Sequence, residues 1–185
     1  MNILFKSMIA GLLALACVHS IGARADSGTY IGLQYGTTIY EESGIPDLQA
    51  ATGILRVGQY GDGAFDYEVR AGIGLSKSDD QDFGASSATV NVDIDSLLGV
   101  YLLARLGAPG STSIYGVFGF SSMEATASAS LGDFSDTISY RETGPSFGLG
   151  MNYGVLDSAL LNIEYISYVS GDDFSASVIS LGILF

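Results

Sequence analysis

The sequence predicts an all-β fold, an eight-stranded antiparallel up-and-down transmembrane β-barrel. Three observations support this prediction. Apolar side chains alternate with small or polar ones over segments of about ten residues, which is the length and period of a barrel strand in a bilayer. The connections between these segments are alternately long and short, as in barrels with long outer loops and short periplasmic turns. The segment at 178–185 alternates in the same way and ends on an aromatic residue, Phe185.

Residues 1–25 have the features of a secretory signal peptide and are excluded from the predicted fold. Lys6 precedes an apolar run at 8–18, and an Ala-Arg-Ala sequence precedes the expected cleavage point. The run is shorter than the roughly 20 residues that a transmembrane helix needs. A lipid anchor on Cys17 is a weaker alternative, because the nearby leucine is one position away from its usual place in such signals. The barrel is therefore expected to occupy residues 26–185.

The expected mature chain is acidic and lacks both cysteine and histidine. All 20 Asp and Glu residues lie after residue 25, whereas two of the seven Lys and Arg residues lie before it, which leaves a formal net charge of −15. This charge argues against a nucleic-acid partner. Without cysteine and histidine the chain has no thiolate nucleophile, no usual zinc site and no imidazole base. We therefore assign no catalytic residue, metal or cofactor, and we expect no enzymatic activity.

The third strand shows the alternation most clearly. Its odd positions at 67–75 are Tyr, Val, Ala, Ile and Leu, whereas the even positions at 68–76 are Glu, Arg, Gly, Gly and Ser. One face therefore suits lipid and the other a polar interior. The same pattern predicts strands at 30–36 and 52–60, with a long polar loop at 41–51 and a tight turn at 61–64.

The remaining strands follow the same rhythm. In the fourth, Val90, Val92 and Ile94 alternate with polar residues that include Asp93 and Asp95, which we expect to point inward. The fifth does not sort its apolar residues by face, so its register stays open. The strands are expected at 90–105, 114–123, 138–153, 161–165 and 178–185, with long loops at 78–88, 125–137 and 170–175 and short turns at 107–112 and 154–158.

Aromatic residues gather at the strand ends that the short turns connect. Because amphipathic rings favour the membrane interface, these residues predict a girdle at the periplasmic side. Its members would be Tyr30, Tyr60, Phe65, Tyr67, Tyr115, Tyr153 and Phe185.

Four segments carry a resemblance to a known family: YIGLQYG at 30–36, EVRAGIG at 68–74, SFGLGMNY at 146–153 and the strand that ends at Phe185. They resemble the small outer-membrane β-barrel family of Gram-negative bacteria, the OmpA-like and OmpX-like eight-stranded barrels. The resemblance implies a monomer in the cell outer membrane, surrounded by lipid and lipopolysaccharide. It also implies insertion by the barrel-assembly machinery, with Phe185 as part of the assembly signal. It implies no single activity, because members include structural anchors and adhesins.

The inward face of the predicted strands collects polar and charged side chains. An eight-stranded barrel is only wide enough for its side chains to fill, so we expect these groups to pair as a plug. A narrow channel with a cation preference is an alternative, because carboxylates outnumber guanidinium groups on this face. The set comprises Gln34, Arg56, Glu68, Arg70, Asp93, Asp95, Asn152 and Glu164, with Arg105 and Glu142 added by parity.

The outer loops supply the candidates for external contacts. Phe83, Phe134 and Phe174 lie in otherwise polar loops and are candidate anchors for an extracellular or host partner, since aromatic residues are enriched in binding hot spots. Lys77 and Arg141 lie near the outer rim and are candidates for contact with lipopolysaccharide phosphates. We therefore expect a structural or surface-interaction role through acidic loops. A soluble periplasmic barrel that binds a small ligand is a further alternative, in which the two faces would be inverted.

Overall fold

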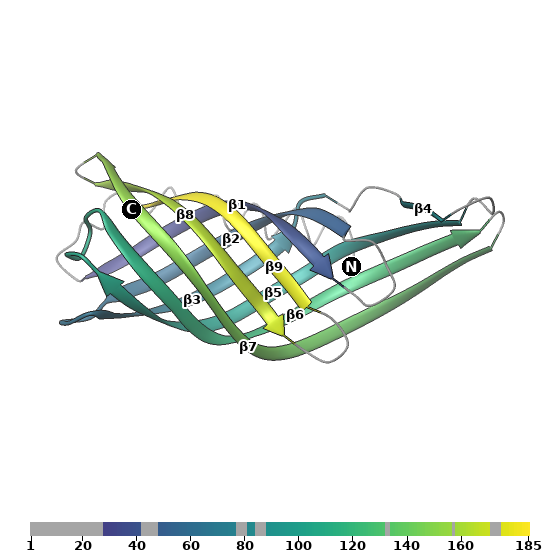
Figure 1. Cartoon of the computed structure of the whole chain (residues 1–185), viewed down its shortest axis with the longest axis horizontal. Coiled ribbons are helices and arrows are strands. Elements are labelled where there is room, and N and C mark those ends of the chain that lie inside the picture. The colour runs from purple at the N-terminus through teal and green to yellow at the C-terminus, as the bar shows by residue number, and fades with distance from the viewer. Residues whose placement is uncertain are drawn as a thin grey trace.

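The computed structural model describes residues 28–41, 48–76, 81–83, 88–131, 134–156, 158–170 and 175–185. Within these ranges the chain forms β-strands and no helix, and Figure 1 shows them wound into a barrel. All eight predicted strands are present, and the short β4 is an addition within the predicted loop at 78–88. The strands are β1 (Thr29–Glu41), β2 (Leu48–Tyr60), β3 (Phe65–Gly74), β4 (Gln81–Phe83), β5 (Ala88–Leu106), β6 (Ser113–Leu131), β7 (Phe134–Leu156), β8 (Ala159–Ser170) and β9 (Ser175–Leu184).

The barrel has the predicted up-and-down order. Each long strand pairs antiparallel with the next long strand along the chain, and β3 pairs directly with β5. The barrel closes where β1 pairs with β9, from Gly32 opposite Leu184 to Glu41 opposite Ser175. The C-terminus lies at the same end as the short connections (Figure 1). The predicted fold class is therefore confirmed.

The outward face of the barrel is an apolar surface. In β3, Tyr67 and Val69 are exposed, whereas Glu68 and Arg70 between them are buried, as the alternation predicts. The strand whose register the sequence left open is β6, in which odd residues such as Tyr115 point inward and even residues point outward. Its pattern was ambiguous because apolar side chains occupy both faces. A surface of this kind suits lipid and excludes the inverted, soluble barrel.

The inward face of β5 changes parity at Asp95. The β5–β6 register shifts between Ile94 and Ser96, which makes Asp95 the extra residue of a β-bulge. From Leu97 onward the odd residues of β5 point inward. Before the bulge, toward the outer end of the barrel, the even residue Ile94 points inward and is buried. Asp93 and Asp95 therefore lie on the outward face, and the prediction that they face the interior is wrong. One inserted residue exchanges the two faces of every position beyond it.

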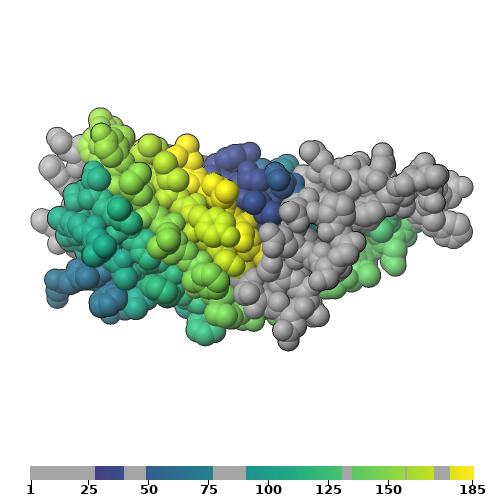
Figure 2. Space-filling model, in the orientation of Figure 1, coloured from purple at the N-terminus to yellow at the C-terminus, as the bar shows by residue number. Residues whose placement is uncertain are grey.

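β5, β6 and β7 continue past the rest of the barrel at its outer end. Residues 88–96, 122–131 and 134–143 of these strands form a sheet that we call the projection. It extends to the right of β8 and β9 in Figure 1, and part of it is the green surface at the right of Figure 2. The predicted loop at 125–137 is therefore wrong over most of its length, because β6 and β7 pair as far as Leu131 and Phe134.

Alternation explains why the projection is a sheet although its residues are small. In β6, alanines at 125, 127 and 129 lie on the face that is continuous with the barrel interior, and hydroxyl groups lie on the opposite face. The hydroxyl oxygens of Thr126 and Ser139 are 3.0 Å apart across the strands, and Thr126 donates to Asp95 at 2.5 Å. Cross-strand hydroxyl pairs of this kind stabilise a ladder that the composition alone suggests is a loop.

Candidate functional site

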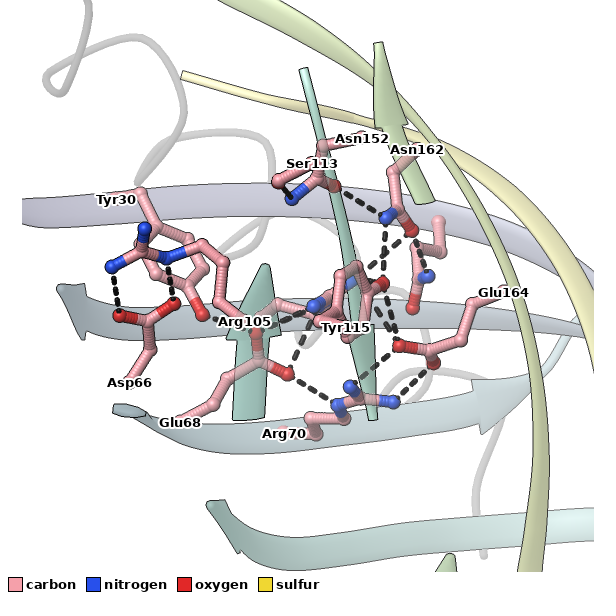
Figure 3. Close-up of polar contacts among 12 residues, drawn as sticks. Tyr30, Asp66, Glu68, Arg70, Arg105, Ser113, Tyr115, Asn152, Asn162 and Glu164 are labelled. Carbon is pink, nitrogen blue, oxygen red and sulfur yellow. Dashed lines mark hydrogen bonds and ion pairs between the residues drawn. The ribbon is translucent and has the colours of Figure 1, made fainter. Parts of the chain in front are cut away.

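Two arginines and two glutamates form the centre of the barrel interior. Arg56 donates to Glu68 at 2.7 to 3.0 Å, and Arg70 binds both Glu68 and Glu164 (Figure 3). The four side chains come from β2, β3 and β8 and are fully buried. Their charges cancel, and each charge has an opposite partner, which is the condition for keeping ions in a dry interior.

Tyrosine and amide side chains surround this centre and complete its hydrogen bonds. Tyr30 donates to Glu68 at 2.7 Å, and Tyr115 donates to Glu164 at 2.8 Å. Asn162 donates to Tyr115 at 2.7 Å and accepts from Arg56 at 2.9 Å. Two further predicted residues join through Asn162, since Gln34 donates to it and Asn152 accepts from it.

Three of the predicted girdle residues, Tyr30, Tyr60 and Tyr115, turn toward the interior instead. Tyr30 and Tyr115 are buried in the network, whereas Phe65, Tyr67 and Tyr153 are exposed on the outward face as predicted. The inward parity of β1 already places Tyr30 beside Gln34 on one face. That parity is the signal that could have identified it.

Glycines on neighbouring strands make room for these rings. Gly58 lies opposite Tyr30, and Gly150 lies opposite Tyr115. A β-carbon at either glycine would overlap the facing ring. Each tyrosine therefore lies flat across a backbone that has no side chain, and this packing directs its hydroxyl toward the carboxylates.

A second ion pair lies at the end with the short connections. Arg105 donates to both oxygens of Asp66, at 2.7 and 3.2 Å, and to the backbone oxygen of Gly63. The ring of Tyr60 lies 5.6 Å from the Arg105 guanidinium. Parity predicts Arg105 correctly, but Asp66 lies just outside the expected strand and was missed. This pair binds the turn before β3 to the end of β5.

Between the ionic centre and the outer end of the barrel, apolar side chains fill the interior. Ile54 follows Arg56 toward the outer end of β2, and Ile166 follows Glu164 in β8. With Asp93 and Asp95 outside, the central carboxylates do not outnumber the guanidinium groups, so the observation that favoured a cation channel no longer holds. The apolar cluster includes Ala50, Ile54, Val92, Ile94, Leu97, Met123, Ala125, Ile166, Tyr168, Ala176 and Val178.

The remaining candidates lie at the edges of the described structure. Arg141 is on the outward face of β7, where it donates to Glu124 at 2.8 Å. Phe83 lies in β4 and Phe134 begins β7, whereas Lys77 and Phe174 lie outside the described residues. Most acidic residues of the predicted outer loops also lie outside them.

The structure also describes Phe185, the predicted assembly signal, and Glu142, which parity places on the inward face. The Phe185 side chain points outward, and its backbone exchanges two hydrogen bonds with Ile31. Glu142 lies half-buried at an inward position of β7.

No cluster of three or more Asp, Glu, His or Cys side chains that could hold a metal ion occurs in the described part of the chain. A helix that is long and apolar enough to cross a membrane is likewise not found there. The central glutamates are held by arginines and tyrosines, so the interior residues form a structural network.

A strand barrel with an apolar exterior and a filled, charge-balanced interior defines a small integral membrane barrel. The family model for the outer membrane protein beta-barrel domain matches residues 8–185. The chain therefore belongs to this family of outer-membrane barrels of Gram-negative bacteria, and it is an outer-membrane protein. A comparison with curated protein sequences found no match.

Solved structures of similar fold include three outer-membrane proteins. Neisserial surface protein A has a TM-score of 0.59 at 15% identity, over 87% of this chain and 98% of that one. Ail, the attachment invasion locus protein of Yersinia pestis, in complex with the heparin analogue sucrose octasulfate, has a TM-score of 0.57 at 15% identity, over 85% and 97%. A major outer membrane protein of Thermus thermophilus has a TM-score of 0.56 at 13% identity, over 85% and 98%. At these identities the likeness shows the fold alone.

Proposed function

We propose that the protein is a non-enzymatic surface-interaction protein, in which the barrel is a closed anchor and the outer end makes the contacts. The observation that carries this proposal is the projection, in which β5, β6 and β7 continue beyond the other long strands. A barrel needs only about 9 to 11 residues per strand to cross the bilayer, but β7 has 23. The additional length serves no purpose in spanning the membrane, whereas it presents a sheet to the surroundings.

The chemistry of the outer end limits the kind of partner. The acidic charge of the chain disfavours the polysulfated ligand that the structure of Ail contains, because like charges repel. The outward face of the projection offers hydroxyl groups and the Arg141–Glu124 pair, in which the arginine side chain is 68% exposed. A polar protein surface suits this face. Phe83, Phe134 and Phe174 remain proposed anchors for such a partner.

Contact between Arg141 and a lipopolysaccharide phosphate is part of the same proposal. Along β7, Arg141 lies on the outer side of the exposed apolar residues that begin at Phe147, and its guanidinium has further donors beside the bond to Glu124. Arg141→Gln should weaken binding of purified lipopolysaccharide to the protein in detergent. An unchanged affinity would remove this contact from the proposal. Insertion by the barrel-assembly machinery through Phe185 also stays a proposal.

Truncation of the projection tests the proposed function. Glu124 and Arg141 face each other across β6 and β7, so a tight turn between them can replace residues 125–140 without changing the register below. Bacteria that display the wild-type or the truncated barrel are compared for binding to layers of animal cells and to immobilised serum proteins. We expect binding that the truncation abolishes, with equal amounts of heat-modifiable barrel in the outer membrane. Equal binding by both strains would overturn the proposal.

A further inference from the structure

A hollow of about 410 Å³ lies beside the turn between β2 and β3. This turn is at the end of the barrel with the short connections, away from the projection (Figure 1). Gln59, Phe65 and Tyr67 border the hollow from the outward face of the two strands, and Asp62 borders it from the turn. We call it the turn hollow.

The turn hollow lies where the outward face of the barrel changes from apolar to polar. Val57 faces Val69 across β2 and β3, and both side chains are exposed on the apolar outward face. The next outward pair, Gln59 and Tyr67, is two residues nearer the turn, which is about 7 Å along the strands. Exposed tyrosine rings at such a boundary lie at the level of lipid headgroups. The turn hollow is therefore at headgroup level.

Three polar side chains at the turn hollow have no partner within the described part of the chain. They are the carboxylate of Asp62, the amide of Gln59 and the hydroxyl of Tyr67. The nearby Asp66 differs, because it accepts hydrogen bonds from Arg105 and from the backbone N–H of Gly61. Asp62 is thus left as a negative charge beside the exposed rings of Phe65 and Tyr67.

A carboxylate beside aromatic rings is suited to an alkylammonium group. The faces of the rings attract the positive charge, and the carboxylate and the Tyr67 hydroxyl accept hydrogen bonds from the ammonium N–H groups. The amide of Gln59 can donate to an oxygen of a phosphate that follows the ammonium along the same headgroup. The three unpaired groups therefore match the two charges of a zwitterionic headgroup.

The charges around the turn hollow disfavour an anionic headgroup. Arg105 reaches the same turn, but its guanidinium already donates to Asp66 and to the backbone oxygens of Gly63 and Gly107. Among the described residues that border the hollow, the only charged side chain is Asp62, which repels a phosphate that has no ammonium beside it.

We propose that the turn hollow binds a phospholipid with a primary ammonium headgroup. Asp62 and the two rings hold the ammonium, Gln59 holds the phosphate, and the acyl chains lie on the apolar outward face beside Val57 and Val69. A soluble amine or the amino group of a peptide offers the same ammonium but nothing that covers this apolar face. The inference is independent of the proposed function, because the turn hollow and the projection are at opposite ends of the barrel.

Competition between two lipids tests the headgroup. The protein folded in detergent micelles is titrated with equal amounts of phosphatidylethanolamine and phosphatidylglycerol that carry the same acyl chains, and bound lipid is counted by native mass spectrometry. We expect the first bound lipid to be phosphatidylethanolamine, with a preference of about fivefold, the most that an exposed charge pair supplies. Equal retention of the two lipids would overturn the proposal.

A second titration distinguishes a lipid from a soluble amine. Free phosphoethanolamine has the same headgroup but no acyl chains, so it should bind more than roughly tenfold more weakly than the lipid, because it buries no apolar surface. Binding as tight as that of the lipid would assign the hollow to a soluble amine and overturn the lipid.

Matched variants locate the preference. Asp62→Asn should remove it, whereas Asp136→Asn, which removes an exposed carboxylate at the outer end, should leave it unchanged. Tyr67→Leu should weaken phosphatidylethanolamine binding about threefold. Tyr153→Leu removes another exposed ring that does not border the hollow, and it should have no effect. A heat-modifiable band establishes that each variant is folded. A preference that survives Asp62→Asn, or that Asp136→Asn also removes, would overturn the site.

Hydrogen–deuterium exchange shows where the lipid is bound. The protein is compared in nanodiscs of phosphatidylethanolamine and of phosphatidylglycerol. Amides at 61–64 should exchange more slowly in phosphatidylethanolamine, whereas amides at 154–156, at the end of β7, should exchange equally in both. Equal protection of the two segments, or protection of neither, would contradict a site in the turn hollow.

Discussion

Arg70 and Glu164 bind each other across the barrel interior, although 94 residues separate them in the chain. Arg70 lies on β3 and Glu164 on β8, which are not neighbours in the sheet. Two nitrogens of the guanidinium face the two oxygens of the carboxylate, and both groups are fully buried. A paired geometry of this kind fixes the orientation of both side chains. The contact thus joins opposite parts of the barrel through its centre.

Glu164→Gln should destabilise the barrel strongly. The substitution keeps the shape of the side chain but leaves Arg56 and Arg70 with Glu68 as the only carboxylate in the centre. Loss of one partner of a buried ion pair costs about 3 to 5 kcal/mol. The free energy of unfolding is measured in urea with detergent-folded protein, using the heat-modifiable band as the signal.

An exposed ion pair supplies the control for this substitution. Glu124→Gln removes the carboxylate that Arg141 contacts, on a surface that water reaches. Surface pairs contribute at most about 1 kcal/mol, so this variant should unfold close to the wild-type midpoint. Equal losses in the two variants would show that the central network is not what holds the barrel together.

The sequence predicts the interior well where alternation is unbroken. In β2, β3 and β8, one parity places Arg56, Glu68, Arg70 and Glu164 on the inner face, and all four lie there. Parity does not reveal which carboxylate meets which arginine, because that depends on the shear and closure of the whole barrel. Parity also assigns the wrong face beyond a bulge, because the composition around Asp95 does not predict that a bulge forms there.

The outer end was predicted less well for a different physical reason. Small residues at 125–137 resemble a loop in composition, and only their pairing across the hairpin shows that they form strands. Tyr30 and Tyr115 were assigned to the interface because an aromatic ring at a strand end suits either location. A glycine opposite the ring on the neighbouring strand indicates an interior location. Which glycine lies opposite a given tyrosine depends on the strand register, which the sequence does not give directly.

Gly150→Ala should destabilise the barrel because the new methyl group would overlap the ring of Tyr115. Overpacking of this kind costs about 1 to 3 kcal/mol. It should also displace the Tyr115 hydroxyl from Glu164. Gly63→Ala is the control, since a β-carbon there would have no neighbour within 4 Å. The two variants are compared by urea unfolding, and equal stability would contradict the packing of Tyr115 across Gly150.

Cysteine labelling tests the parity change in β5. Outside the predicted signal peptide the chain contains no cysteine, so an introduced thiol is the only one to react. Asp95→Cys should react with a membrane-impermeant maleimide on intact cells, because Asp95 lies on the outward face of the projection. Ile94→Cys should not react, since that position is 2% exposed. The reverse pattern would restore unbroken alternation and remove the bulge.

Conductance across a planar lipid bilayer tests most directly the central claim that the barrel is a closed anchor. The interior described here is filled by a charge-balanced network and by apolar side chains on its outer side. We predict that inserted wild-type barrels, verified by their heat-modifiable band, conduct no current above the bare bilayer at physiological salt. A stable, cation-selective conductance would contradict the account, because it would make the interior and not the projection the working part of the protein.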